Sequence, residues 1–141
     1  MSDFHFSMPL RVRVRDLNYG GHVGNDVVLG YFQEGRAGYL GRIGGFSEVD
    51  IGGCGIILPE AHVNYRAEMF LGDELELKVR IGELGRSSMR MEYRLERAGE
   101  VTADGWTALV AFDYGRRRPV RLPQGFVEAV TRFETGEKDN E

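Results

Sequence analysis

The sequence predicts an α+β fold in which an antiparallel sheet wraps around one long helix. Residues 26–43 form the only long segment with the pattern of a buried helix, because apolar or small residues cover much of its circumference. Residues 73–83 and 88–97 alternate apolar and polar side chains, as strands do. Short glycine-containing turns separate these strands, which is typical of antiparallel hairpins.

The 141 residues are enough for one domain, and we predict a single domain over 1–141 with a disordered acidic tail from about 134. The net charge of −4 argues against nucleic acid as the main partner. One cysteine, Cys54, excludes an internal disulfide and is consistent with a reducing cytoplasm. Since the sequence shows neither a signal peptide nor an apolar membrane span, we expect a cytoplasmic protein with no membrane partner.

The N-terminal segment predicts one strand and one loop. Residues 8–15 alternate, with Leu10, Val12 and Val14 facing one way and arginines facing the other, which indicates a half-buried strand. Residues 16–25 follow as a polar, glycine-rich loop that leads directly into the helix.

The helix is expected from about Asp26 to Ile43, with Asn25 as its N-cap and Gly44-Gly45 at its end. Glycine lowers helix propensity by up to about 1 kcal/mol against alanine. We therefore expect close packing against the sheet to offset the glycines within this helix, which are Gly30, Gly35, Gly38 and Gly41.

The rest of the chain predicts mostly sheet. An irregular or short helical connection over 45–55 is followed by strands at 56–65, 73–83, 88–97 and 105–114 and by a short helix at 123–133. Pro59 indicates a bulge or a sheet edge near the start of the first of these strands. Weaker alternation in the last strand indicates deeper burial.

The segment RVRVRDLNYGGHVGNDVVLGYFQEGRAGYL resembles the start of the hotdog superfamily, in its 4-hydroxybenzoyl-CoA thioesterase-like branch. Those proteins carry a loop of the form Asp-x-Asp-x-x-Gly-His-Val-Asn-Asn before the central helix, and residues 16–25 here read DLNYGGHVGN, with Asn18 in place of the second aspartate. The segments HVNYRAEMFLGDELELKVRIGELGRSSMRMEY and ADGWTALVAFDYGRRRPVRLP resemble the later strands, so that the resemblance spans about residues 8–130.

This resemblance implies a hotdog fold and an acyl-CoA thioesterase, a hydrolase that converts an acyl- or aroyl-CoA to the free acid and CoA. It also implies a homodimer or homotetramer with acyl sites at the subunit interface, and no cofactor. A different class of protein, a non-hydrolytic acyl-CoA-binding protein, is the alternative. A hydratase-type hotdog enzyme is disfavoured because its His motif is absent. Nucleotide hydrolysis and dinucleotide redox chemistry are disfavoured because no phosphate-binding glycine motif occurs.

Asn18 occupies the position at which the family has its nucleophile or general base, an aspartate. An amide does not accept a proton at neutral pH, but it can orient water or the thioester carbonyl by hydrogen bonds. The alternative role for Asn18 is to hold a turn of the loop. Asp16 matches the first aspartate of the motif and is expected mainly to accept N–H bonds within the loop, with a part in catalysis as the alternative.

Two side chains are candidates for the general base that Asn18 does not supply. His22 is the one imidazole in the motif, and imidazoles titrate near neutrality; its alternative role is to shape the loop by bonding to backbone. Glu34, on the helix, could activate water from beside the thioester. Its alternative role is a salt bridge with Arg36, Arg42 or a partner subunit.

Backbone and surface groups complete the predicted site. The amide hydrogens of Gly24 and Asn25, at the helix start, could hold the thioester carbonyl oxygen. The resemblance implies that CoA is bound by the hairpin residues Arg86, Ser87 and Ser88, whose guanidinium and hydroxyl groups suit phosphates. Residues 116–118 form a second basic patch. No group of residues has the spacing of metal ligands.

Overall fold

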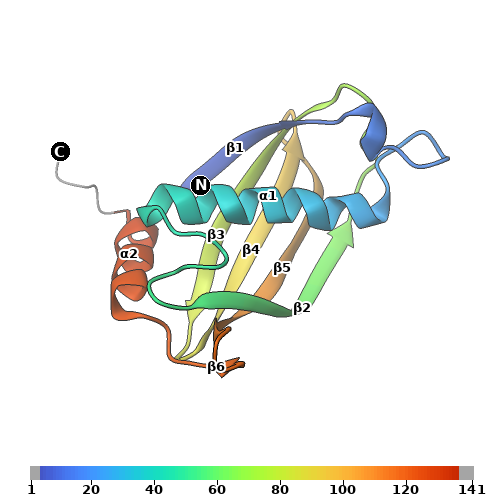
Figure 1. The fold of residues 1–141 in the computed structure, drawn as a ribbon. Helices are drawn as coiled ribbons and strands as arrows, with labels where there is room; N and C mark the ends of the chain where they lie inside the picture. The colour runs from blue at the N-terminus through green and yellow to red at the C-terminus, as the bar shows by residue number, and fades with distance from the viewer. Residues whose placement is uncertain (1–3, 137–141) are drawn as a thin grey trace.

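A long helix lies across one face of a six-stranded antiparallel sheet in the computed structural model, which describes residues 4–136 (Figure 1). The elements in chain order are β1 (Phe6–Arg11), a 3₁₀ turn (Val14–Asp16), α1 (Asn25–Gly44), β2 (Gly55–Tyr65), β3 (Glu74–Leu84), β4 (Ser88–Arg97), β5 (Glu100–Asp113), β6 (Arg118–Pro119) and α2 (Gln124–Glu134). The sheet order is β1-β3-β4-β5-β2, and β6 pairs with β5. The predicted α+β arrangement is confirmed.

The first strand is shorter than predicted. Pairing of β1 with β3 stops at Arg11, and the chain then turns through the 3₁₀ segment, which is closed by a bond from the Arg13 amide to Asp16 Oδ2 at 2.9 Å. Val12 is still buried, but Val14 is 73% exposed, so the prediction that both face the core is wrong for Val14. The alternation of apolar and polar residues continues through residues 12–15 although the chain turns there, because a 3₁₀ turn does not require a particular residue type.

The long helix begins one residue earlier than predicted. Gly24 is the N-cap, with an extended backbone, and Asn25 is the first helical residue, so the prediction of Asn25 as the cap is wrong. The predicted end is confirmed: Gly45 adopts a φ of +70° and its amide donates to Gly41 O at 2.9 Å. A residue in this left-handed conformation is commonly glycine, because other side chains are strained there.

The glycines of α1 fall into two groups. A Cβ on Gly35 would overlap Leu77 Cδ2 of β3, and one on Gly38 would lie 3.0 Å from Phe6 Cζ of β1. These two glycines therefore let the helix approach the sheet closely, as predicted. Gly30 and Gly41 have open space where a Cβ would stand, so they face away from the sheet.

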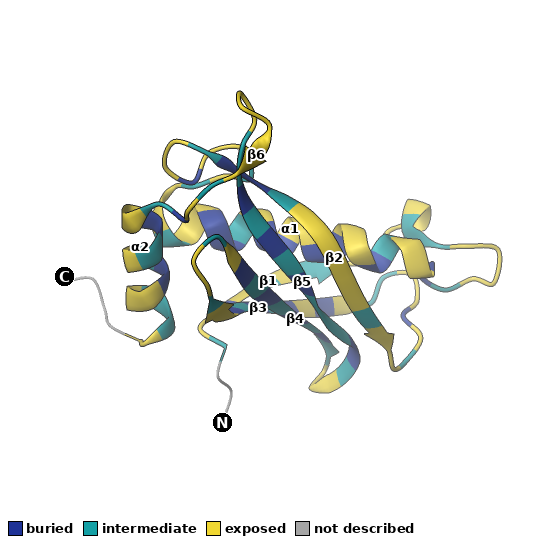
Figure 2. Ribbon diagram, turned by 90° about the horizontal axis from the view of Figure 1, so that it is seen from below, coloured by how far each residue is buried: buried dark blue, intermediate teal, exposed yellow. Residues whose placement is uncertain are grey.

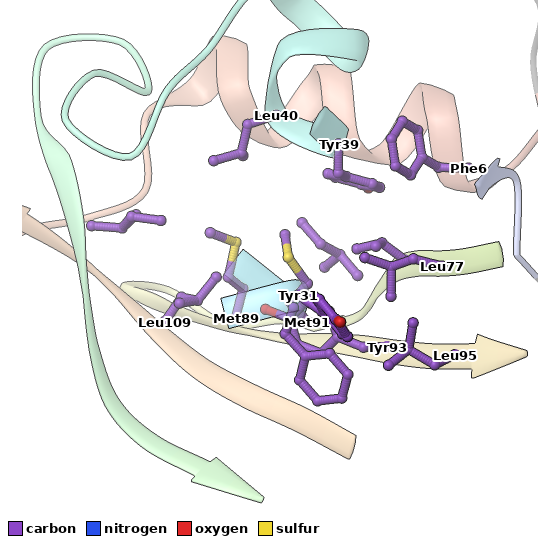
Figure 3. Close-up of a cluster of buried hydrophobic side chains, with 14 of the residues drawn as sticks. Phe6, Tyr31, Tyr39, Leu40, Leu77, Met89, Met91, Tyr93, Leu95 and Leu109 are labelled. Atoms are coloured by element: carbon purple, nitrogen blue, oxygen red, sulfur yellow. The ribbon is translucent and has the colours of Figure 1, made fainter. Parts of the chain in front are cut away.

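The core fills the space between α1 and the sheet, with side chains from the helix and from the concave face of the strands (Figure 3). Phe32 stacks on Tyr93 of β4 with ring centroids 4.4 Å apart. A buried polar chain crosses this core: Arg36 donates to Tyr93 Oη at 3.0 Å, and Tyr93 bonds to Thr107 of β5 at 2.7 Å. The Arg36 charge is balanced by Glu48, at 3.1 Å.

The strand predictions hold for β2, β3 and β4 to within one residue. The register of β2 with β5 shifts between Ile57 and Glu60, which confirms the bulge expected near Pro59. The last long strand begins at Glu100 rather than 105, because the turn at Ala98 and Gly99 leads straight into pairing with β4.

The strand β2 lies at an edge of the sheet and is exposed along much of its length (Figure 2). At the C-terminus, the predicted helix is confirmed as α2, whose last residue is Glu134. The predicted disordered tail from 134 to 141 falls largely outside the described residues.

Candidate active site

The loop 16–25 is a closed turn that projects from the start of α1. An isolated bridge pairs Leu17 with Val23, and the Asn18 amide donates to His22 O at 2.9 Å. The Asn18 side chain accepts a bond from the Gly20 amide at 2.9 Å, which is the turn-holding role foreseen for it. Asn18 is itself exposed. Its carbonyl oxygen is thus already engaged in shaping the loop.

Asp16 anchors the loop to the helix. Its Oδ2 accepts bonds from the Arg13 amide at 2.9 Å and from the Tyr31 hydroxyl at 2.8 Å. Burial, and then the bond to Asp16, raises the pKa of Tyr31 far above its ordinary value, so the phenol remains a donor. These contacts support the structural role that was expected for Asp16.

His22 is held by backbone on one side and faces a carboxylate on the other. Nδ1 lies 3.1 Å from Val23 O, and Nε2 lies 3.8 Å from Glu68 Oε2. A carbonyl oxygen only accepts, so this contact assigns the hydrogen of a neutral imidazole to Nδ1 and leaves the lone pair of Nε2 free. That is the form in which an imidazole acts as a base.

A hollow of about 230 Å³ lies beside His22 and is lined by residues of the loop, the start of α1 and the segment after β2. Its other lining residues include Asn25, Val28, Tyr65 and Met69. The Tyr65 hydroxyl donates to Asn25 O at 3.0 Å and so joins the end of β2 to the helix start. The hollow combines an imidazole with mainly apolar walls.

One of the two amides predicted to hold an oxyanion at the helix start is already engaged. The Gly24 amide donates to Asp16 O at 3.1 Å, so in this structure it is not free to hold an oxyanion. Among residues 4–136, the amide hydrogens of Asn25 and Asp26 have no acceptor. These two donors, at the positive end of the helix dipole, suit a developing negative charge.

Glu34 lies in a different hollow from His22. This hollow, of about 560 Å³, is on the β1 side of α1 and is also lined by Asp16 and Tyr31. Glu34 is nine residues beyond Asn25, or roughly 13 Å along the helix axis. Within the described part of the chain no ion pair involves Glu34, because Arg36 pairs with Glu48 instead. One copy of the chain therefore does not bring Glu34 and His22 together.

The residues predicted to bind CoA lie at the opposite end of the sheet. Ser88 pairs with Val110, which pairs with Ile57, and Ile57 is eight positions before Tyr65 on β2. Since strands rise by about 3.3 Å per residue, Ser88 is roughly 26 Å along the strand direction from the helix start. Figure 1 shows this hairpin beside α2 and β6, and the Leu122 amide donates to Arg86 O.

Glu68 is a residue of this site that sequence reasoning missed. It follows β2, and its segment is held against the loop by a bond from the Val23 amide to Met69 O at 2.9 Å. An exposed glutamate between two strands carries no signal of its own. Only the folded chain brings it to His22, which is 46 positions away in the sequence.

Comparison with known proteins agrees with this architecture. A sequence model described as the thioesterase-like superfamily matches residues 12–130. The chain belongs to the thioesterase-like superfamily. A thioesterase from Thermus thermophilus, crystallised with coenzyme A and zinc, is 36% identical and superposes with a TM-score of 0.83, covering 96% of this chain and 98% of that one.

More distant thioesterases share the fold of this thioesterase-like protein. The 1,4-dihydroxy-2-naphthoyl-CoA thioesterase of Synechocystis is 21% identical, with a TM-score of 0.80 over 89% of this chain and 95% of that one. The DHNA-CoA thioesterase of Staphylococcus aureus is 20% identical, with a TM-score of 0.82 over 92% and 90%. The predicted hotdog fold is thus confirmed.

The described part of this thioesterase-like protein was searched for a metal site and for a membrane-spanning helix. Within residues 4–136, no three side chains among His, Cys, Asp and Glu are arranged to bind a metal ion. None of the described helices has the length and apolar character that crossing a membrane requires.

Proposed function

We propose that this protein hydrolyses the thioester of an acyl- or aroyl-CoA. The observation that carries the proposal is that His22, whose Nδ1 is held by Val23 O, and Asn25, whose amide hydrogen is free, line the same hollow. A base and an oxyanion donor within one small hollow are the two groups that ester-type hydrolysis needs. The 36% identity to a thioesterase that was crystallised with coenzyme A supports CoA as the carrier.

The proposed reaction uses water as the nucleophile. His22 Nε2 takes a proton from water as its oxygen attacks the thioester carbonyl carbon. The amide hydrogen of Asn25 stabilises the oxyanion that forms, an effect worth on the order of 3 kcal/mol for one donor. When the tetrahedral intermediate collapses, the C–S bond breaks and the imidazolium proton passes to the sulfur, which gives CoA and the free acid.

In this scheme Asn18 acts on the loop rather than on the substrate. Its side chain holds the turn that carries His22, a role supported by the bond from the Gly20 amide. Glu34 lies outside this hollow and contributes to the same site only if a second copy of the chain presents it. Of the two predicted bases, the geometry within one chain favours His22.

A homodimer would explain how the hairpin residues reach the substrate. The outer edge of β2 has no strand partner among residues 4–136, and an open edge of this length invites pairing. If two β2 strands pair antiparallel about the middle of the strand, at Glu60, then Tyr65 of one copy lies beside the start of β2 in the other. Arg86, Ser87 and Ser88 of the second copy would then lie roughly 15 Å away, or three strand spacings.

The alternative function is acyl-CoA binding without hydrolysis. It is favoured by one observation, which is that Asn18 replaces the carboxylate of the family motif and uses its side-chain oxygen in a turn. The fold and the hollow would serve binding equally well.

Thiol release from benzoyl-, short-chain and long-chain acyl-CoA tests the proposal. We expect turnover by the wild type and a loss of roughly 10²- to 10⁴-fold in His22→Gln, the usual effect of a missing general base. Glu34→Gln is the matched comparison, since its carboxylate lies in the other hollow. Acyl-CoA binding without turnover in the wild type would establish the alternative, and unchanged turnover in His22→Gln would refute the assignment of the base.

A further inference from the structure

A second hollow, on the β1 side of α1, carries charges that the proposed hydrolysis does not use. Its volume of about 560 Å³ falls within the range of small-molecule sites, roughly 300 to 1,000 Å³. Its walls come from β1, from the 3₁₀ turn and from α1. The lining residues with charged or hydroxyl groups are Arg11, Arg13, Arg15, Asp16, Tyr31, Glu34 and Glu74.

The early end of β1 places three arginines around this hollow. On a continuous strand Arg11, Arg13 and Arg15 would point outward in a row, but β1 ends at Arg11 and the turn carries the other two around the rim. The turn is fixed by the bond from the Arg13 amide to Asp16, which involves backbone rather than the guanidinium. Arg13 and Arg15 are therefore positioned by the main chain and not by ion pairs.

Most of the acidic groups in the hollow are already committed, while two of the arginines are not. Asp16 accepts bonds from the Arg13 amide and the Tyr31 hydroxyl, and Glu74 lies 3.7 Å from Arg11. Within the described range, neither Arg13 nor Arg15 forms an ion pair through its guanidinium. Both remain available to an anion brought from outside.

We propose that this hollow binds a small molecule through a phosphate monoester, held by Arg13 and Arg15. Each guanidinium presents a planar fork of donors that engages two oxygens, and a phosphate monoester offers three strong acceptor oxygens to two such forks. A carboxylate has only two oxygens. Glu34, on the α1 side, repels an anion and so confines the phosphate to the side formed by the turn.

The floor of the hollow is suited to an apolar part of the same ligand, because Met8 and Leu10 line it and are only partly buried. The phosphate belongs either to the nucleotide part of CoA, a source that rests on the proposed function, or to an unrelated phosphorylated molecule. Both kinds of ligand would present the same phosphate group to the arginines, and the choice of probes distinguishes between them.

Calorimetric titration of the full chain tests the proposal. The probes are CoA, 3′-dephospho-CoA, pantetheine and inorganic phosphate, and the proteins are the wild type, Arg13→Gln/Arg15→Gln and Arg121→Gln/Arg132→Gln. The last variant removes the same charge from exposed sites elsewhere. We expect the first variant to bind at least one phosphate-bearing probe at least tenfold more weakly than wild type, and the control variant to bind as wild type does.

The probes identify the source of the phosphate. If wild type binds CoA more tightly than 3′-dephospho-CoA and the Arg13/Arg15 variant does not, the ligand phosphate is that of CoA. If only binding of inorganic phosphate is lost, a separate phosphorylated molecule is the ligand. Pantetheine, which has no phosphate, should bind all three proteins alike.

Three results would overturn the proposal: no binding of any phosphate-bearing probe to wild type, equal binding by wild type and the Arg13/Arg15 variant, or an equal loss in the control. Should Arg13→Gln/Arg15→Gln fail to fold, Arg13→Lys/Arg15→Lys keeps the charge but loses the fork, and it must still weaken binding. Because binding is measured without turnover, a protein that binds but does not hydrolyse refutes only the proposed function.

Discussion

Nε2 of His22 lies 3.8 Å from Oε2 of Glu68, with side-chain exposures of 30% and 64%. This distance is too long for a direct hydrogen bond, so the two groups attract each other mainly when the imidazole is protonated. In the proposed reaction the imidazole is protonated only after it has taken the proton from water. Glu68 is therefore placed to stabilise the intermediate more than the resting enzyme.

We expect Glu68→Gln to lower kcat by about two- to tenfold with little change in KM, a modest effect because the pair is largely exposed. In a His22→Gln background the same substitution should have no further effect, because the charge it acts on is gone. Initial rates of thiol release for the four proteins of this cycle give the result. Glu76→Gln removes an exposed carboxylate on β3 that does not line the hollow beside His22, and it serves as the control.

Equal effects of Glu68→Gln in the presence and absence of His22 would mean that Glu68 acts on folding or on substrate binding instead. The melting temperatures of the variants separate these two cases.

Substitution of Asn18 separates its effect on the loop from any effect on chemistry. Asn18→Ala removes the acceptor for the Gly20 amide, and we expect a loss of about 1 kcal/mol in the free energy of unfolding together with lower turnover. Asn18→Asp keeps that acceptor, so it should retain the stability of the wild type and at least its activity. Denaturant titration and thiol release measure the two quantities, and an Asn18→Ala variant with wild-type turnover would remove Asn18 from the mechanism.

The carboxylate of Asp73 makes stability depend on pH in the acid range. The Phe70 amide and then the Arg97 guanidinium, both at 2.8 Å, hold the pKa of Asp73 below its ordinary value of 3.8. Its contribution is thus present above that value and is lost as the pH falls through the lower pKa of the folded state. We expect Asp73→Asn to lower the free energy of unfolding by roughly 1 kcal/mol at pH 7, and the difference from wild type to shrink below about pH 4.

Urea titrations between pH 3 and pH 7 provide the measurement. Glu100→Gln, which removes the other and more exposed carboxylate paired with Arg97, should change the pH dependence much less. A constant difference between Asp73→Asn and wild type across this range would show that the charge of Asp73 is not responsible.

The two groups of glycines in α1 predict opposite effects of alanine. Gly35→Ala places a methyl group against Leu77 Cδ2 and 2.9 Å from Val79 Cγ2, and we expect a loss of about 1 to 3 kcal/mol in the free energy of unfolding. Gly41→Ala meets nothing within 4 Å and should gain up to about 1 kcal/mol through helix propensity. Thermal or urea unfolding of the two variants gives the signs, and a stabilising Gly35→Ala would disprove the close packing of α1 on β3.

The sequence predicts best where one physical period governs a segment. Strands β3 and β4 were located to within one residue because their buried side chains follow every second position. The same rule extended β1 too far, since Val12 and Val14 keep the period while the backbone turns. It also missed the start of β5, where Thr102 and Ala103 are fully buried but too small or polar to give an apolar signal.

The site was predicted only in part. The motif identified the loop and the helix start, but the use of the Gly24 amide by Asp16 depends on how the loop folds back. Glu68 and the arginines around the second hollow come together through turns, which no local pattern encodes. His22 and Glu34 line two different hollows because their side chains point in different directions. The spacing of the two residues along the chain does not predict those directions.

The strand order has a consequence for how the chain acquires its structure during synthesis. The strand β1 pairs with β3, and β2 pairs with β5, so Gly55 meets Phe112 only after 57 further residues have been made. Until Glu74 and the residues beyond it emerge, α1 has no sheet to cover its buried face, and its glycines give it little stability alone. Its apolar side chains therefore lack their partners in the sheet until β3 and the later strands have been translated, and burial is completed only when β5 closes the sheet.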